Sequence, residues 1–102
     1  MINHTVLFGL KHDCDESISD KITKEFINLG DTIPEILQIS GGKNVSKEGL
    51  SKNYSLGFSL LFRDADTLSL YLENQEHKLF VSEYVNRYVQ DVVVFDYVVG
   101  VK

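Results

Sequence analysis

The sequence predicts an α+β fold, a ferredoxin-like βαββαβ sandwich in which helices cover one face of a four-stranded antiparallel sheet. Two observations predict it. Four segments have the apolar pattern of strands, and the regions between them repeat apolar residues at helical spacing. Their order along the chain is that of the sandwich. The 102 residues are enough for one domain and too few for two, so we expect a single domain over residues 1–102.

The first strand and the first helix differ in the period of their apolar residues. Alternate residues of 2–10 are apolar, which predicts a strand. Residues 13–17 supply acidic and hydroxyl side chains that favour a helix start, and apolar residues then recur at helical spacing. We expect Gly30 to end this helix, because glycine is typical of helix C-termini and Pro34 prevents continuation. A short strand at about 35–41 and a polar, glycine-containing loop follow.

The second half of the chain repeats this pattern of strand, helix and strand. Residues 54–63 place apolar side chains at every second position, which predicts a strand. Asp64 can cap a short helix over 65–72. After a polar break, a second helical pattern runs to about Val89, and the apolar segment 92–100 is predicted to be the last strand.

The predicted sheet is apolar on both faces, whereas a sheet with helices on one side needs only one apolar face. In the last strand, Val92 and Val94 point one way and the alternating residues point the other. The second apolar face comprises Leu7, Leu61, Val93, Phe95, Tyr97 and Val99. An apolar face of this kind requires a partner, so we expect a two-fold homodimer in which two sheets pack face to face.

Composition excludes several classes of function. The formal net charge is −5 and no run of Lys and Arg stands out, which argues against binding of nucleic acid or of an anionic membrane. The single cysteine, Cys14, cannot form an internal disulfide. No apolar stretch reaches the roughly 20 residues of a membrane span, and the start of the chain lacks the pattern of a signal peptide. We therefore expect a cytoplasmic protein.

Two histidines and one aspartate are candidates for chemistry. His4 interrupts the apolar row of the first strand, where an imidazole is either a hydrogen-bonded structural residue or an acid or base that lines a pocket. His77 lies at the start of the last helix, where the helix dipole favours the neutral imidazole; the alternative is a surface residue that helps to cap the helix. Asp96 is a polar residue on an apolar row of the last strand, where it can pair with a neighbour or orient a histidine.

The sequence offers no convincing metal or cofactor site. Two distant histidines do not make a metal-ligand set. The glycine-rich turn GGKN lacks the strand-then-helix context of a phosphate-binding loop. We expect neither a metal nor a cofactor.

Several segments together resemble a known family. In order, they are NHTVLFGLK, IPEI, GGKNVSKEG, LGFSLLFRDADTLSLYLENQEHKLF and the closing FDY. They resemble the stress-responsive A/B barrel domain family over nearly the whole chain, from His4 to Tyr97. The resemblance implies a ferredoxin-like protomer that dimerises through its sheet into a dimeric α/β barrel. Most members have no assigned activity, but a plant member is a polyketide cyclase that promotes an intramolecular aldol condensation without a cofactor.

The resemblance also implies a set of site residues. His77 matches the catalytic histidine of the plant cyclase, His4 matches its first-strand histidine, and Tyr71 matches a tyrosine near the catalytic residue. A further pocket tyrosine of the cyclase falls at Phe26, which removes a hydroxyl donor and puts the same substrate in doubt. The chemistry implied is general base catalysis. Neutral His77 removes a proton alpha to a carbonyl, and Tyr71 or His4 donates to the developing enolate oxygen.

Three interpretations stay open at this point. The chain is a cofactor-free acid–base enzyme acting on a small carbonyl compound, a dimeric protein that binds a small apolar ligand without turning it over, or a structural, stress-associated protein. We place a small-molecule pocket of unassigned activity first and an identified reaction behind it.

Overall fold

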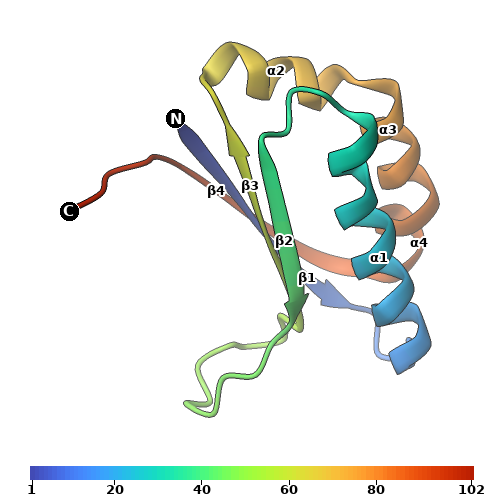
Figure 1. The fold of residues 1–102 in the computed structure, drawn as a ribbon. Coiled ribbons are helices and arrows are strands. Elements are labelled where there is room, and N and C mark those ends of the chain that lie inside the picture. Colours follow the sequence, from blue (N-terminus) through green and yellow to red (C-terminus); the bar gives the residue numbers. More distant parts are fainter.

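The computed structural model describes all 102 residues and has the predicted order of elements. The strands are β1 (Ile2–Leu10), β2 (Gln38–Lys43), β3 (Leu56–Phe62) and β4 (Val89–Val98). The helices are α1 (Glu16–Thr32), α2 (Ala65–Glu73) and α3 (Gln75–Phe80), which continues through a π-helical turn, η1 (Val81–Val85), into α4 (Asn86–Tyr88). The sheet order is β2-β3-β1-β4, with every neighbouring pair antiparallel. Figure 1 shows all the helices on one face, so the predicted ferredoxin-like α+β fold is confirmed.

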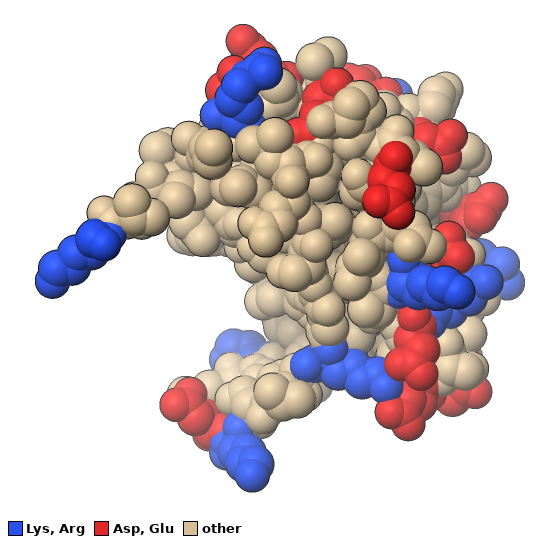
Figure 2. Space-filling view, viewed as in Figure 1, with Lys and Arg blue, Asp and Glu red and all other residues tan.

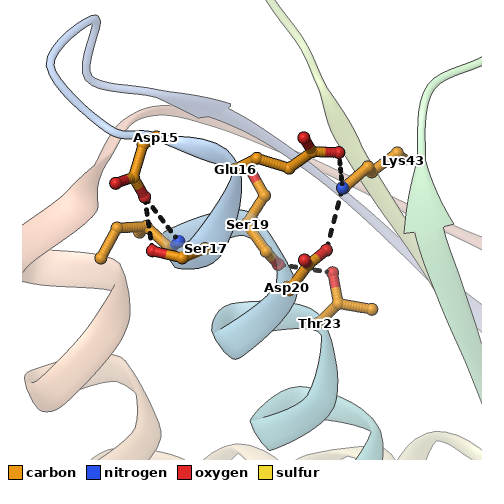
Figure 3. A network of polar contacts seen from close by, with 8 residues as sticks. Asp15, Glu16, Ser17, Ser19, Asp20, Thr23 and Lys43 are labelled. Carbon is orange, nitrogen blue, oxygen red and sulfur yellow. Dashed lines mark hydrogen bonds and ion pairs between the residues drawn. The ribbon is translucent and has the colours of Figure 1, made fainter.

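The start of α1 is held by side chains that its sequence supplies. The Asp15 carboxylate accepts hydrogen bonds from the Ser17 hydroxyl at 2.6 Å and from a backbone N–H of the first turn at 3.1 Å (Figure 3). These hydrogen bonds hold the pKa of the Asp15 carboxyl below its usual value. Lys43 of β2 forms ion pairs with Glu16 at 2.6 Å and Asp20 at 2.9 Å, which joins the helix start to the sheet. Because these pairs are exposed, they contribute little to stability.

The prediction that Gly30 ends the first helix is wrong. The helix continues to Thr32, and Gly30 lies inside its last turn. A β-carbon on Gly30 would lie 2.7 Å from the Ile39 Cγ2 atom, so glycine allows α1 to approach β2 closely. The helix ends because Pro34 favours an extended conformation at the residue before it, and Ile33 is indeed extended.

The second strand was also predicted in the wrong place. It occupies Gln38–Lys43 instead of 35–41, so the first residues of the expected glycine-containing loop belong to β2. Gly41 pairs with Phe58 of β3, and a β-carbon on Gly41 would lie 2.2 Å from the Phe58 ring. Glycine at this position therefore lets the Phe58 ring lie across β2. In the sequence, a glycine that serves packing in a strand cannot be distinguished from a glycine that begins a loop.

The ends of the last two strands differ from the prediction by a few residues. β3 begins at Leu56 instead of residue 54, because the Tyr54 N–H donates to the Ser51 carbonyl in a turn. β4 begins at Val89, directly after the last helix, because Val89 already pairs with Leu10 of β1.

No helix has both the length and the apolar content to span a membrane.

The core lies between the sheet and the helices and is centred on aromatic rings. Phe8, Phe26, Phe58 and Phe80 contact one another with ring centroids 4.4–5.8 Å apart. The helices leave one strand of this face uncovered. Val92 and Val94 of β4 pair with buried residues of β1 and face the helical side, yet they are 46 % and 54 % exposed. The covered face therefore has an open edge along β4.

The opposite face of the sheet, the open face, carries no helix. The strand register places on it five of the six apolar side chains predicted for it: Leu7, Leu61, Val93, Phe95 and Tyr97. The sixth, Val99, lies beyond the end of β4. Among them lies a polar group in which the Ser59 hydroxyl donates to Asn3 at 2.7 Å and the Asn3 amide donates to Thr5 at 2.8 Å. The loop after β2 and the C-terminal end both project from this side and frame a hollow (Figures 1 and 2).

Candidate functional site

A cavity of about 270 Å³ lies at the uncovered edge, between β1, β4 and the helical layer. We call it the β4 cavity. Its lining consists of His4, Val6, Phe8, Phe26, Tyr71, Leu72, His77, Phe80, Val81, Val85, Val92, Val94 and Asp96. Larger hollows of about 590 Å³ and 570 Å³ lie beside the loop after β2 and between α1 and α4. Only the β4 cavity brings together the three site residues expected from the sequence.

His4 and Asp96 enter the cavity from neighbouring strands. They are directly opposite in the register of β1 and β4 and therefore share a face of the sheet. The His4 Nδ1 atom lies 2.5 Å from an Asp96 carboxylate oxygen. A carboxylate accepts, so the hydrogen lies on Nδ1 and the Nε2 atom is left free. His4 is buried, whereas the Asp96 side chain is 40 % exposed.

Tyr71 comes from α2 and is fully buried. Its ring lies 5.9 Å from the His4 ring and 4.4 Å from the His77 ring, measured between centroids. The Tyr71 hydroxyl has no hydrogen-bond partner in the protein. Burial raises the pKa of this hydroxyl, because the charged phenolate is poorly solvated there. The group therefore keeps its proton at neutral pH and is an unused hydrogen-bond donor.

His77 reaches the cavity because the helical layer is broken before it. Asn74 is extended, ends α2 and caps α3, with its side chain accepting from the Glu76 N–H at 2.8 Å. The next turn brings His77 against Tyr71, and the His77 Nδ1 atom lies 3.4 Å from the Leu72 carbonyl oxygen. A carbonyl can only accept, so Nδ1 carries the hydrogen and Nε2 keeps its lone pair.

The electrostatics around His77 favour its neutral form. Burial lowers the pKa of His77, and the neighbouring His4 and Lys78 lower it further, while the contact with the Leu72 carbonyl acts in the opposite direction. At neutral pH the side chain is therefore an imidazole able to accept a proton. The structure thus places a proton acceptor beside a proton donor, Tyr71, in one cavity.

The structure brings His4, Tyr71 and His77 together in one cavity. Phe26, which the resemblance placed in a pocket, also lines it. The apolar wall, formed by Val92 and Val94 of β4 and by Val81 and Val85 of η1, was not anticipated as part of a site. Val92 and Val94 alternate with the same period as Asp96 and so lie on its face of β4, which could have identified the β4 part of the wall from the sequence. The π-helical turn has no such signal in the sequence, although turns of this kind are frequent at functional sites.

The remaining histidine lies elsewhere. His12 is exposed on the turn before α1 and does not belong to the cavity lining. No group of three or more His, Cys, Asp or Glu side chains has an arrangement that could hold a metal ion.

Comparison with known proteins identifies relatives over almost the whole chain. Residues 2–99 match the sequence profile of the family described as Stress responsive A/B Barrel Domain. Olivetolic acid cyclase from Cannabis sativa is 22 % identical over 96 residues, which cover 94 % of each chain.

Solved structures share the fold at low sequence identity. The Arabidopsis thaliana protein At3g17210 superposes with a TM-score of 0.91 at 22 % identity, covering 100 % of this chain and 98 % of its own. Hydroxynitrile lyase from Passiflora edulis has a TM-score of 0.87 at 17 % identity, with 97 % and 93 % covered. A dimeric ferredoxin-like protein of unknown function from Thermobifida fusca has a TM-score of 0.83 at 16 % identity, with 96 % and 90 % covered.

Proposed function

Because the chain belongs to the stress-responsive A/B barrel domain family, we propose that it binds a small carbonyl compound in the β4 cavity and catalyses proton transfer on it without a cofactor. The observation that carries this proposal is the Tyr71 hydroxyl, which is buried and unpartnered beside His77. A buried donor without a partner is unfavourable, and a ligand carbonyl oxygen would satisfy it. The same contact would place the carbon alpha to that carbonyl near the His77 imidazole.

His77 is the proposed general base. Its Nε2 atom takes a proton from the carbon alpha to the ligand carbonyl, and the electron pair of the broken C–H bond moves to the carbonyl oxygen as an enolate. The Tyr71 O–H donates to that oxygen, where negative charge develops. In an aldol step the enolate carbon attacks a second carbonyl of the same molecule, and the imidazolium returns the proton to the new alkoxide.

His4 and Asp96 complete the proposed site. The Asp96 carboxylate fixes His4 in one tautomer and orientation, as carboxylates do for functional histidines in general. The His4 ring lies 5.9 Å from the Tyr71 ring, between centroids, and its Nε2 atom would be a second polar atom for the ligand. Asp96 is a positioning residue in this scheme.

The relatives support acid–base chemistry, and the difference at Phe26 supports a ligand that differs from that of olivetolic acid cyclase. Olivetolic acid cyclase, by its name, closes a ring, which agrees with the aldol chemistry implied by the resemblance of His4, Tyr71 and His77. Phe26 stands at the position of the further cyclase tyrosine and lines this cavity without a hydroxyl. The proposed reaction is therefore of the same kind, on a different compound.

Exchange of alpha protons tests the proposal without knowledge of the product. Small ketones with apolar arms, such as 4-phenylbutan-2-one, are incubated with the protein in D₂O, and loss of the alpha-proton signal is followed by NMR. The wild type should accelerate exchange, and His77→Gln should reduce the rate to the background, because glutamine cannot take up the proton. His12→Gln is the matched control, since His12 is exposed outside the cavity. Equal exchange by wild type and His77→Gln would overturn the role of His77.

A binding function without turnover is the second candidate, favoured by the apolar wall of the cavity. A protein of this kind would be stabilised by ketones through mass action and would show no exchange above background. Thermal unfolding with increasing ketone concentration, beside the exchange assay, distinguishes the two functions.

We also propose that the chain forms a homodimer through its open face. Phe95 and Tyr97 are 63 % and 45 % exposed on that face, and isolated sheets rarely leave such side chains in water. The Thermobifida fusca protein of the same fold is described as dimeric. The cytoplasmic location stays a prediction from the sequence.

A further inference from the structure

The β4 cavity has an unusual balance of charge. Its lining includes one formally charged side chain, the Asp96 carboxylate, and ten of its 13 residues are hydrophobic. Asp96 is already paired with His4. The polar end of the cavity therefore offers hydrogen bonds from Tyr71, His4 and His77, and its only fixed formal charge is negative.

The cation next to His77 in the sequence is paired outside the cavity lining. Lys78 follows His77 on α3, but its ammonium group lies 3.3 Å from the Glu73 carboxylate, and its side chain is 54 % exposed. It is absent from the cavity lining. A carboxylate or phosphate in the cavity would thus meet Asp96 and apolar side chains, with no ammonium or guanidinium group to pair with it. Burial of an unpaired charge is strongly unfavourable.

We propose that the β4 cavity selects uncharged carbonyl compounds, aldehydes or ketones with an apolar arm, and excludes carboxylates and phosphates. This inference rests on the proposed function and names its substrate class. Asp96 and the apolar wall formed by Val92 and Val94 determine the selectivity. The volume of about 270 Å³ lies below the range of about 300–1,000 Å³ that holds drug-sized ligands, so the whole ligand is small.

Matched pairs of probes test the selectivity. 4-Phenylbutan-2-one and 3-phenylpropanoate have the same apolar arm and differ in a methyl group against a charged oxygen, and pairs with longer and shorter arms extend the set. Dissociation constants at pH 7 are measured from shifts in the ¹H–¹⁵N spectrum of the wild-type protein. The ketone of each pair should bind at least about tenfold more tightly than the carboxylate.

A charge placed on the wall should change the preference. Val94→Lys adds an ammonium group to the cavity lining at a side chain that is already 54 % exposed. It should raise the affinity for the carboxylate, relative to that for the ketone of the same pair, at least about tenfold. Val98→Lys is the matched control, because Val98 has the same parity on β4, is 78 % exposed and lies outside the lining. It should change neither affinity.

The outcomes separate the inference from the proposed function. Binding of a carboxylate by the wild type as tight as that of its ketone overturns the inference and leaves the cavity as a ligand site. An equal effect of Val94→Lys and Val98→Lys also overturns it, since selectivity then does not arise in the cavity. Binding of no ketone in the set, together with no alpha-proton exchange, overturns the proposed function and the inference with it.

Discussion

The two faces of the sheet show how one alternating pattern can lead to two different kinds of burial. On the covered face, Phe8 and Phe58 lie under the chain's own helices and are 2 % exposed. On the open face, Phe95 is similar in size and lies on a neighbouring strand, yet it is 63 % exposed. The strand pattern predicts that both faces are apolar. Which face is buried within one chain depends on where the helices pack. The edge along β4 is a third case. It belongs to the helical side of the sheet, but the helices do not cover it, and the β4 cavity lies there.

The largest effect should come from removal of an aromatic ring on the covered face. Phe58→Ala should lower the free energy of unfolding by about 3–5 kcal/mol, because the ring packs against Phe8 and Phe26 and leaves a cavity. Urea denaturation measures the change. Leu61→Ala lies on the opposite face of the same strand and should cost clearly less in the monomer. A cost as large as that of Phe58→Ala would mean that the two faces do not differ as described.

A charge on the open face should dissociate the proposed dimer and leave the monomer folded. Phe95→Asp should raise the dimer dissociation constant about 100-fold, because it removes a large apolar contact and introduces a buried charge. Sedimentation velocity at several concentrations measures the constant. Leu70→Asp is a fitting control, since Leu70 is also exposed, at 58 %, but lies on α2. A wild-type monomer at micromolar concentration would refute the dimer.

Removal of the unpartnered hydroxyl should increase stability. Tyr71→Phe should raise the free energy of unfolding by about 1 kcal/mol, because it removes a buried donor without a partner and keeps the ring. The same variant should slow alpha-proton exchange, since the donor to the enolate is lost. Urea denaturation and the NMR assay on one sample measure both effects. A loss of stability would show that the hydroxyl has a partner in solution.

Tyr71 should also give the protein an alkaline limit. Its pKa is raised on folding, so its ionisation has no effect on stability below the ordinary value of 10.0 and lowers the free energy of unfolding as the pH rises above that value. Stability curves between pH 8 and pH 11 should therefore fall more steeply for the wild type than for Tyr71→Phe. Parallel curves would contradict the assignment.

The smallest effect should be on the acid side. The pKa of His77 is lowered on folding, so its contribution is present above the ordinary value of 6.5 and is lost as the pH falls toward the folded value. His77→Gln should make the stability curve between pH 5 and pH 7 flatter, which urea denaturation at each pH measures. The groups around His77 are Tyr71, which contacts its ring, and His4 and Lys78, which lower its pKa.

The sequence predicted the order of elements and the two apolar faces, because both follow from periodicity. It failed where glycine serves packing instead of a turn. Gly30 and Gly41 have the appearance of a helix end and a loop start, but each allows the close approach of one side chain, Ile39 and Phe58 respectively, that only the tertiary structure reveals.

The site was predicted in part, for a related reason. His4 and Asp96 were visible as polar residues on apolar rows, and strand pairing then made them neighbours. The distance between Tyr71 and His77 depends on the angle at Asn74, which no pattern in the sequence encodes. The sequence did not predict the apolar wall, because Val92 and Val94 have the pattern of core residues. They are exposed because the helices do not cover β4.

The apolar wall has a consequence for how such a protein diverges. Val92 and Val94 lie outside the buried core, so substitutions there change the shape of the cavity at little cost to folding. The acid–base groups Tyr71 and His77 lie on a different part of the chain, in the helical layer. Substitutions on the edge strand β4 can therefore change which ligands bind, while Tyr71 and His77 stay unchanged. Directed evolution for a new carbonyl compound should begin with libraries at these two valines.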